Sequence, residues 1–321
     1  MIGRVAALLA GLALALPAAN AQAPRFPERP VRIVVPFPAP GAADYLGRLI
    51  AQRLAAATGQ QVLVENRPGA AAAIGADHVA KSAPDGYTLL LGTTSSHAIG
   101  PAVGKLPYDP VKDFAPITMV SYSAFALVVH PSVPANNVAE LVALARSRPG
   151  KLDMASFGNG SAAHLFGELF KARAGVFMLH VPYKGSAPAL LDLIAGRTHL
   201  MFDNLLSVLP HVKAGKLRAL GVTTNTRAAA APELPPIADT LPGYEAIGWF
   251  GMFAPARTPA PIVHELNAAV VRILKDAEMR NLLAARGMTA VGDRADEFAA
   301  TIGRDLAKWT QLVKSAGIRI E

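Results

Sequence analysis

The sequence predicts an α/β protein with two lobes, each built on a central, mainly parallel sheet that is flanked by helices. The chain has 321 residues, of which 52% are hydrophobic and 17% charged, so it can bury more than one sizeable core. Short β-branched runs alternate with segments of helical spacing, which is typical of parallel sheets covered by helices. A second strand-helix series starts near residue 124, which indicates a second lobe.

The first 23 residues are typical of a secretory signal peptide. They contain 17 hydrophobic residues and one charge, Arg4, and their apolar core spans residues 5–16. A membrane anchor is the alternative, but a bilayer needs about 20 apolar residues. We therefore expect export to the periplasm, with cleavage after Ala21 or Ala23.

Strands and helices of the first lobe follow from hydrophobic spacing. Leu46, Leu49, Ile50 and Leu54 recur at helical intervals after a proline-rich break at residues 36–41. A second helix is expected in the Ala-rich stretch 74–81. The predicted strands of this lobe span residues 31–35, 61–65, 87–91 and 117–120.

The second series begins with an apolar extended run at residues 124–130. Asn137 with Glu140 three positions later predicts a capped helix start. Further strands are expected at residues 152–157, 178–182, 199–202 and 217–223, and further helices at residues 162–172 and 187–195.

After a proline-rich connection, a strand is predicted at residues 247–253, followed by helices and one short strand at 288–291. The last helix places Phe298, Ile302, Leu306, Trp309 and Val313 on one apolar face, which predicts core packing. Because these helices lack strands for a sheet of their own, we expect them to dock on the first lobe.

These assignments define the predicted organisation of the chain. The chain would cross between the lobes twice, near residues 124 and 245. The predicted units are a signal peptide at 1–23, a discontinuous lobe 1 at 24–124 and 245–321, and lobe 2 at 125–244.

Composition excludes several classes of function. The absence of cysteine rules out disulfides, iron-sulfur clusters and a thiol nucleophile. The formal charge of +8 is dispersed, and aromatic residues make up only 6%, so no nucleic-acid surface is expected. The histidines do not cluster at metal spacing, and we predict neither a metal nor a cofactor.

A loop at residues 38–44 lies between a predicted strand and a predicted helix. Free N–H groups and the positive end of the helix dipole favour an anion there, so Gly41, Ala42 and Ala43 are candidate ligands of a carboxylate. The alternative is an ordinary turn in which Asp44 complements the helix dipole.

A second loop, at residues 156–164, also joins a strand to a helix and fits the spacing G-x-G-x-x-A. A dinucleotide site would need an acidic residue after the next strand, where this chain has Tyr183, Lys184 and Gly185 instead. We therefore predict an anion site without a cofactor. Its candidate residues are Gly158, Asn159, Gly160, Ser161 and His164.

Other predicted strand ends add polar residues that would converge on one crevice, because ligands of open α/β sheets bind outside the carboxyl ends of the strands. His97 and His164 are, taken singly, more typical of surface positions, and Lys184 would either pair with a carboxylate or be solvated. These further candidates are Phe37, Thr93, Thr94, Ser95, His97, Tyr183, Lys184, Gly185 and Asp203.

An enzyme remains the competing class. Ser161 and His164 are three positions apart and would supply a hydrolase or lyase with reactive groups, as would His97. However, the chain has no G-x-S-x-G elbow, and Ser161 stands where a helix would recruit its hydroxyl as a cap.

Six segments of the mature chain resemble the solute receptors of tripartite tricarboxylate transporters, also called Bug receptors. They are residues 26–38 (FPERPVRIVVPFP), 64–70 (VENRPGA), 83–90 (APDGYTLL), 181–189 (VPYKGSAPA), 201–204 (MFDN) and 249–256 (WFGMFAPA). The resemblance covers nearly all of the mature chain. One departure is Pro40-Gly41, where the family usually has two glycines, so proline removes one donor.

The resemblance implies a type II periplasmic binding protein, with two crossing strands and a small carboxylate held between the lobes without chemistry. It also implies a monomer that presents its ligand to a membrane permease; a sensor component for a membrane kinase is the alternative. We expect carboxylates at the helix starts after Gly41 and Gly160, with Asp44 and Asp203 screening ligands. Dicarboxylates, tricarboxylates, acidic amino acids and aromatic acids all remain open as ligands.

Overall fold

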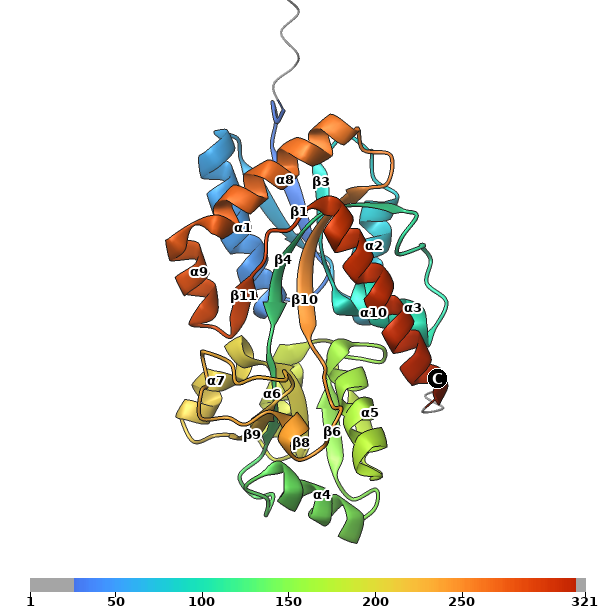
Figure 1. The fold of residues 1–321 in the computed structure, drawn as a ribbon, viewed down its shortest axis with the longest axis vertical. Helices are drawn as coiled ribbons and strands as arrows, with labels where there is room; N and C mark the ends of the chain where they lie inside the picture. Colours follow the sequence, from blue (N-terminus) through green and yellow to red (C-terminus); the bar gives the residue numbers. More distant parts are fainter. Residues whose placement is uncertain (1–25, 316–321) are drawn as a thin grey trace, which may run out of the picture.

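The computed structural model describes residues 26–315. The predicted signal peptide and its cleavage site lie outside the described residues. Figure 1 shows two lobes arranged along the long axis of the molecule, with β4 running from the first lobe toward the second and β10 running back beside it. Among the described residues, no helix combines the length and the apolar character that crossing a membrane requires.

The first lobe contains a six-stranded sheet in the order β11-β4-β10-β3-β1-β2. Its strands are β1 (Val31–Val35), β2 (Val62–Asn66), β3 (Thr88–Thr93), β4 (Phe114–Ser123), β10 (Gly248–Pro255) and β11 (Met288–Ala290). The helices of this lobe are α1 (Ala42–Thr58), α2 (Ala73–Ala80), α3 (Gly100–Val103), α8 (Ala260–Lys275), α9 (Ala277–Ala284) and α10 (Ala295–Ser315). Three short 3-10 or π turns complete the chain: η1 (Ala70–Ala72) and η2 (Ser95–Ile99) in this lobe, and η3 (Ile237–Asp239) on the returning connection.

The second lobe contains a five-stranded sheet in the order β7-β6-β8-β5-β9. Its strands are β5 (Phe125–Val129), β6 (Asp153–Ser156), β7 (Leu179–Pro182), β8 (Leu200–Asn204) and β9 (Arg218–Val222). Its helices are α4 (Val138–Ser147), α5 (Ala162–Ala174), α6 (Ser186–Ile194) and α7 (Leu205–Lys213). The Asn137 side chain accepts from Glu140 N–H, so the predicted cap of α4 is confirmed.

Both sheets are mixed rather than mainly parallel as predicted. β1 pairs in parallel with β2 and β3, and β6 pairs in parallel with β7 and β8. In contrast, β10 runs antiparallel to β3 and β4, and β5 runs antiparallel to β8 and β9. The physical reason is that β10, which returns from the second lobe, and β5, which follows β4 into the second lobe, each run against the strand-helix repeats of their sheet, whereas β4 keeps the direction of β1 and β3. The alternation of strands and helices in the sequence does not report this reversal.

The two connections between the sheets lie side by side. β4 ends at Ser123 and β5 begins at Phe125, and the register of β10 pairs Gly248 with Ser123. Ala124 N–H donates to Gly287 O and Ala124 O accepts from Leu205 N–H, so this residue is bonded to both lobes. The distribution of strands over the sheets is compatible with the predicted lobes, whose exact boundaries stay a prediction.

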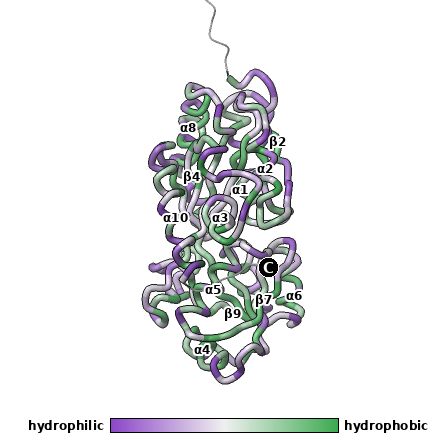
Figure 2. The backbone as a smooth tube through the Cα atoms, turned by 90° about the vertical axis from the view of Figure 1, so that its right-hand side faces the viewer, coloured by the Kyte–Doolittle hydropathy of each residue, from purple (hydrophilic) through white to green (hydrophobic). Residues whose placement is uncertain are grey.

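The last helix packs on the first lobe and reaches the second. Phe298, Ile302, Trp309 and Val313 are buried, and the Phe298 ring lies 5.1 Å from that of Phe253 in β10. Trp309 stacks on Phe166 of α5 with ring centroids 5.5 Å apart. Figure 1 shows the C-terminal end of α10 descending toward α5. Figure 2 shows hydrophobic strands inside both lobes and hydrophilic segments at the periphery.

Candidate functional site

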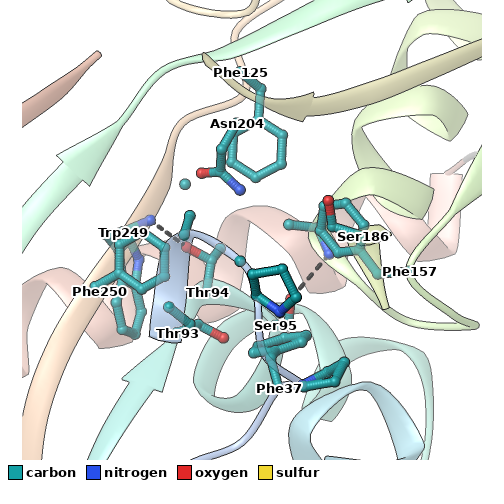
Figure 3. Close-up of a pocket in the computed structure, with 17 residues that line it drawn as sticks. Phe37, Thr93, Thr94, Ser95, Phe125, Phe157, Ser186, Asn204, Trp249 and Phe250 are labelled. Atoms are coloured by element: carbon teal, nitrogen blue, oxygen red, sulfur yellow. Dashed lines mark hydrogen bonds between the residues drawn. The ribbon is translucent and has the colours of Figure 1, made fainter. Parts of the chain in front are cut away.

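A cavity lies where the two sheets meet, with about 540 Å³ of empty space that includes its open mouth, and both lobes contribute to its wall. Figure 3 shows the side chains converging on it from the ends of several strands. The first lobe contributes Phe37, Pro38, Pro40, Gly41, Ala42, Ala43, Thr93, Thr94, Ser95, Gly248, Trp249 and Phe250. The second contributes Phe125, Phe157, Ala162, Ser186 and Asn204, so no charged side chain lines this cavity.

Helix α1 begins at the cavity without a side-chain cap. Its N-cap residue, Gly41, is extended (φ −178°) and has no side chain that could accept from the first-turn amides. Asn66 Nδ2 donates to Phe37 O at 3.0 Å, which holds the preceding loop. Uncapped amides and the helix dipole together favour an anion at Ala42 and Ala43. Pro40 lies before these residues and leaves their two amides in place.

Three hydroxyl residues at the end of β3 face the same cavity. The Thr93 side-chain oxygen is buried and has no protein partner among the described residues. Thr94 Oγ1 accepts from Trp249 N–H at 2.8 Å, and Ser95 Oγ accepts from Ala162 N–H at 2.9 Å. Because an oxygen that accepts keeps its own hydrogen, all three hydroxyls retain a donor for a ligand.

The start of α5, expected to bind a carboxylate, is already occupied by protein side chains. Ser161 Oγ accepts from His164 N–H at 3.3 Å, and Ala162 N–H donates across the lobes to Ser95. Gly160 N–H donates to His164 Nδ1 at 3.2 Å. These bonds use the amides of Gly160, Ala162 and His164, and of this helix start only Ala162 is among the lining residues, so the expected carboxylate position after Gly160 is not supported.

The same hydrogen bonds argue against a hydrolase that uses Ser161 and His164. Ser161 is bonded to the main-chain N–H of His164, while the ring of His164 accepts from Gly160. That ring stacks on His180 with centroids 3.8 Å apart, and its Nε2 lies 3.4 Å from Glu168 Oε1. The imidazole is therefore not placed to take a proton from the serine.

Several other predicted residues lie away from the cavity wall. Asp44 forms an ion pair with Arg48 at 2.8 Å. His97 is fully buried, stacks on Phe253 at 4.0 Å and is bonded through Nδ1 to Ser96 Oγ; burial lowers its pKa to about 3. Gly158 and Asn159 belong to the loop before α5 and are not among the lining residues.

The loop after β7 places its predicted residues around the cavity rather than in its wall. Tyr183 donates through its hydroxyl to Asp192 Oδ2 at 2.8 Å, and Lys184 is exposed. Gly185, with φ +144°, packs against the Pro38 ring of the first lobe. This contact closes one side of the cavity between the lobes.

Sequence reasoning identified Phe37 but missed the other phenylalanines of the wall, Phe125, Phe157 and Phe250. The rings of Phe37 and Phe157 meet edge to face across the lobes at 6.4 Å, and Phe125 lies 6.2 Å from Phe157. Phe250 completes this apolar surface. In the sequence, a phenylalanine at a strand end looks the same as a core residue. The only available indication was its position at the first or last residue of a predicted strand.

Sequence reasoning also missed Ser186 and Asn204, which screen Asp203 from the cavity. Ser186 Oγ donates to Asp203 Oδ2, and Asn204 N–H donates to Asp203 Oδ1 at 2.7 Å. Asp203 is fully buried. Burial raises the pKa of its carboxyl to about 7, although the bonds from Ser186 and Asn204 oppose the shift.

The raised pKa of Asp203 predicts a loss of stability with rising pH. The unfolded value is about 3.9, so the folded protein holds the proton more tightly, and stability falls as pH rises from about 4 to about 7. Asparagine at this position does not titrate. The free energy of unfolding of the Asp203→Asn variant, minus that of the unmutated protein, should therefore increase from pH 5 to pH 8.

Urea unfolding of both proteins at each pH measures this gain. Burial lowers the pKa of His97 and of His180 to about 3, so these two histidines make the folded protein less stable as the pH falls, opposite to the effect of Asp203. Both proteins contain both histidines, so the histidine contribution cancels when their stabilities are subtracted. A stability difference that is the same at both pH values contradicts the prediction.

Comparison with known proteins identifies the family. A model described as a tripartite tricarboxylate transporter family receptor matches residues 46–318. This chain belongs to that receptor family. The protein BugT of Bordetella pertussis is 36% identical to it, over 95% of this chain and 94% of BugT.

Solved structures agree with the sequence comparison. The structure of R. palustris Rpa4515 with adipate is 40% identical with a TM-score of 0.89, and covers 92% of this receptor and 99% of that chain. MatC from Rhodopseudomonas palustris with bound malate is 33% identical with a TM-score of 0.85, and covers 90% and 100%. The family and the two-lobe fold that the sequence predicted are thereby confirmed.

Proposed function

We propose that this receptor is exported to the periplasm, closes around a small carboxylate and presents it to a membrane permease of the tripartite type. The signal peptide at residues 1–23, cleaved after Ala21 or Ala23, belongs to this proposal. Receptor-family membership supports capture rather than chemistry. The bound adipate and malate of the two relatives support a carboxylate as the ligand class.

The observation that most directly supports carboxylate binding is the uncapped start of α1 in the cavity wall. Ala42 and Ala43 lie in that wall, and the buried, unpartnered hydroxyl of Thr93 lies in the same wall. A ligand carboxylate would accept from both kinds of donor and would meet the positive end of the helix dipole. The site holds an anion without needing a lysine or arginine.

Closure between the lobes supports the receptor mechanism. Ser95 of the first lobe accepts from Ala162 of the second, and Pro38 packs on Gly185. A ligand that contacts both walls binds this closed form better than an open form, so it shifts the population toward closure. The adjoining connections at Ala124 and Gly248 are the expected hinge, and the permease would recognise the closed form.

A thermal-shift screen of small carboxylates, followed by calorimetry, tests the proposal. A ligand at 100 times its dissociation constant should stabilise the receptor by about 2.7 kcal/mol. Neutral amides of the same acids are the matched controls and should produce no shift. Equal stabilisation by an acid and by its amide would remove the carboxylate from the proposal.

A further inference from the structure

We propose that the receptor selects acids with a single carboxylate, which the first lobe binds, and a hydroxyl at the far end, which the second lobe binds. This inference rests on the proposed function and adds the ligand class. It depends on the direction of the hydrogen bonds in the two walls of the cavity.

The wall of the first lobe presents hydrogen-bond donors to the cavity. The amides of Ala42 and Ala43 are uncapped. The Thr93 hydroxyl has no protein partner, and Thr94 and Ser95 use their oxygens as acceptors, which leaves their hydrogens available. This wall therefore suits a carboxylate, which only accepts.

In the wall of the second lobe, the Ala162 amide and the Ser186 hydroxyl donate to protein groups rather than to the cavity. The Ala162 amide, at the start of α5, donates to Ser95. The Ser186 hydroxyl donates to Asp203, and Asn204 Nδ2 lies 3.5 Å from Asp203 Oδ1, which leaves its second hydrogen for a ligand. Helix α6 begins after Gly185 without a side-chain cap, but the Asp203 carboxylate lies beside its first residue, Ser186, and offsets the positive end of the helix dipole. Ser186 lines the cavity, and its oxygen keeps a lone pair that can accept from a ligand.

Asp203 adds charge to this asymmetry. It is fully buried, its partners are the neutral groups of Ser186 and Asn204, and no cation contributes to its pKa. A second ligand carboxylate at this wall would face a buried negative charge in a low dielectric and would find no free hydroxyl donor. A ligand hydroxyl would instead donate to Ser186 Oγ and accept from Asn204 Nδ2.

The space between the walls suits an apolar ligand body. Phe37, Phe125, Phe157 and Phe250 line it, so an alkyl chain or an aromatic ring would be buried there. The resulting class is a hydroxylated monocarboxylate with an apolar middle.

Calorimetry at pH 8 with three six-carbon acids tests which group the second lobe prefers at the far end of the ligand. They are 6-hydroxyhexanoate, hexanoate and adipate, which differ only at the far end. We expect 6-hydroxyhexanoate to bind about tenfold more tightly than adipate, because the second carboxylate of adipate would face the negative charge of Asp203. Hexanoate should lie between them, since its methyl end neither meets that charge nor gains a hydrogen bond.

The Asp203→Asn variant tests the positioning role of the carboxylate. Its amide oxygen would accept from Asn204 N–H, and its Nδ2 would donate to Ser186 Oγ, which turns the serine hydrogen toward the cavity. We expect the preference over adipate to fall to within about threefold. Asp192→Asn is the matched control, since Asp192 bonds to Tyr183 and Arg197 outside the cavity and should keep the full preference.

A second variant keeps the test decisive if Asp203→Asn folds poorly. Ser186→Ala removes the acceptor. It should lower the affinity for 6-hydroxyhexanoate and leave the affinity for hexanoate unchanged. Tightest binding of adipate to the unmutated receptor overturns this inference and leaves the proposed carboxylate function standing. Failure of all three acids to bind also overturns this inference, whereas the screen of small carboxylates decides the proposed function.

Discussion

Replacing Ala42 with proline is expected to weaken carboxylate binding by roughly tenfold to 100-fold while leaving the fold intact. Ala42 is the first residue of α1, a position at which proline is favoured because its missing N–H would have no partner in the helix. Gly41 before it is extended (φ −178°, ψ 175°), which suits the residue that precedes a proline. The substitution therefore removes a ligand donor and spares the helix.

The loss should be large because the donor interacts with a charge. A hydrogen bond to a charged group contributes about 1.5–3 kcal/mol, which corresponds to roughly tenfold to 100-fold in affinity. The proline ring also enters the space in which the carboxylate would lie, since Ala42 lines the cavity. Calorimetry with the tightest acid of the screen measures the loss.

The matched control is Ala277→Pro, at the first position of the exposed helix α9. It makes the same chemical change far from the cavity, and we expect unchanged affinity and an unfolding midpoint close to that of the unmutated receptor. If Ala42→Pro binds the acid as tightly as Ala277→Pro does, the start of α1 is not the carboxylate site.

Replacing Gly185 with alanine should lower the affinity for every ligand, because it hinders closure of the lobes. An added Cβ would lie 2.6 Å from Pro38 Cγ, and the proline ring is too rigid to move aside cheaply. The clash exists only when the second lobe approaches the first, so it raises the free energy of the closed form. Each 1.4 kcal/mol of that cost lowers affinity tenfold, and we expect a loss of about tenfold or more.

Backbone strain at Gly185, where φ is +144°, has to be separated from the clash. Gly175→Ala provides the control, because φ is +62° there and an added Cβ would meet nothing within 4 Å. It should lose about 1 kcal/mol of stability and keep its affinity. Adding Pro38→Ala to Gly185→Ala should restore binding; a double variant as weak as the single one would show that strain, not closure, is responsible.

Much of the local structure could be predicted because it depends on short-range patterns. The strand at residues 31–35 is β1 within the same bounds, and the amphipathic stretch after Gly41 is α1. The capping pair of Asn137 and Glu140 opens α4 as expected. Such features depend on neighbours within about one turn, which the sequence contains.

Candidate site residues were predictable only where the position of a loop was enough. Phe37, Gly41 and the hydroxyl residues Thr93 to Ser95 lie at strand ends and line the cavity. His97 lies just beyond the same strand end and yet is fully buried against Phe253, because a π turn at Ser95–Ile99 rotates its ring into the core. Spacing along the chain does not determine that rotation.

By itself, the sequence determined the positions of most strands and helices, although not of α3 or α7, and that Ser161, unlike Gly41, brings a hydroxyl able to cap its own helix. Only the tertiary structure decided that Ser95 meets Ala162 and that Ser186 gives its hydrogen to Asp203. Pairings of this kind join residues far apart in the chain, and their direction depends on which groups burial leaves without water. For this reason the sequence could indicate a site for an acid, while the orientation of that acid depends on the packing of the two lobes.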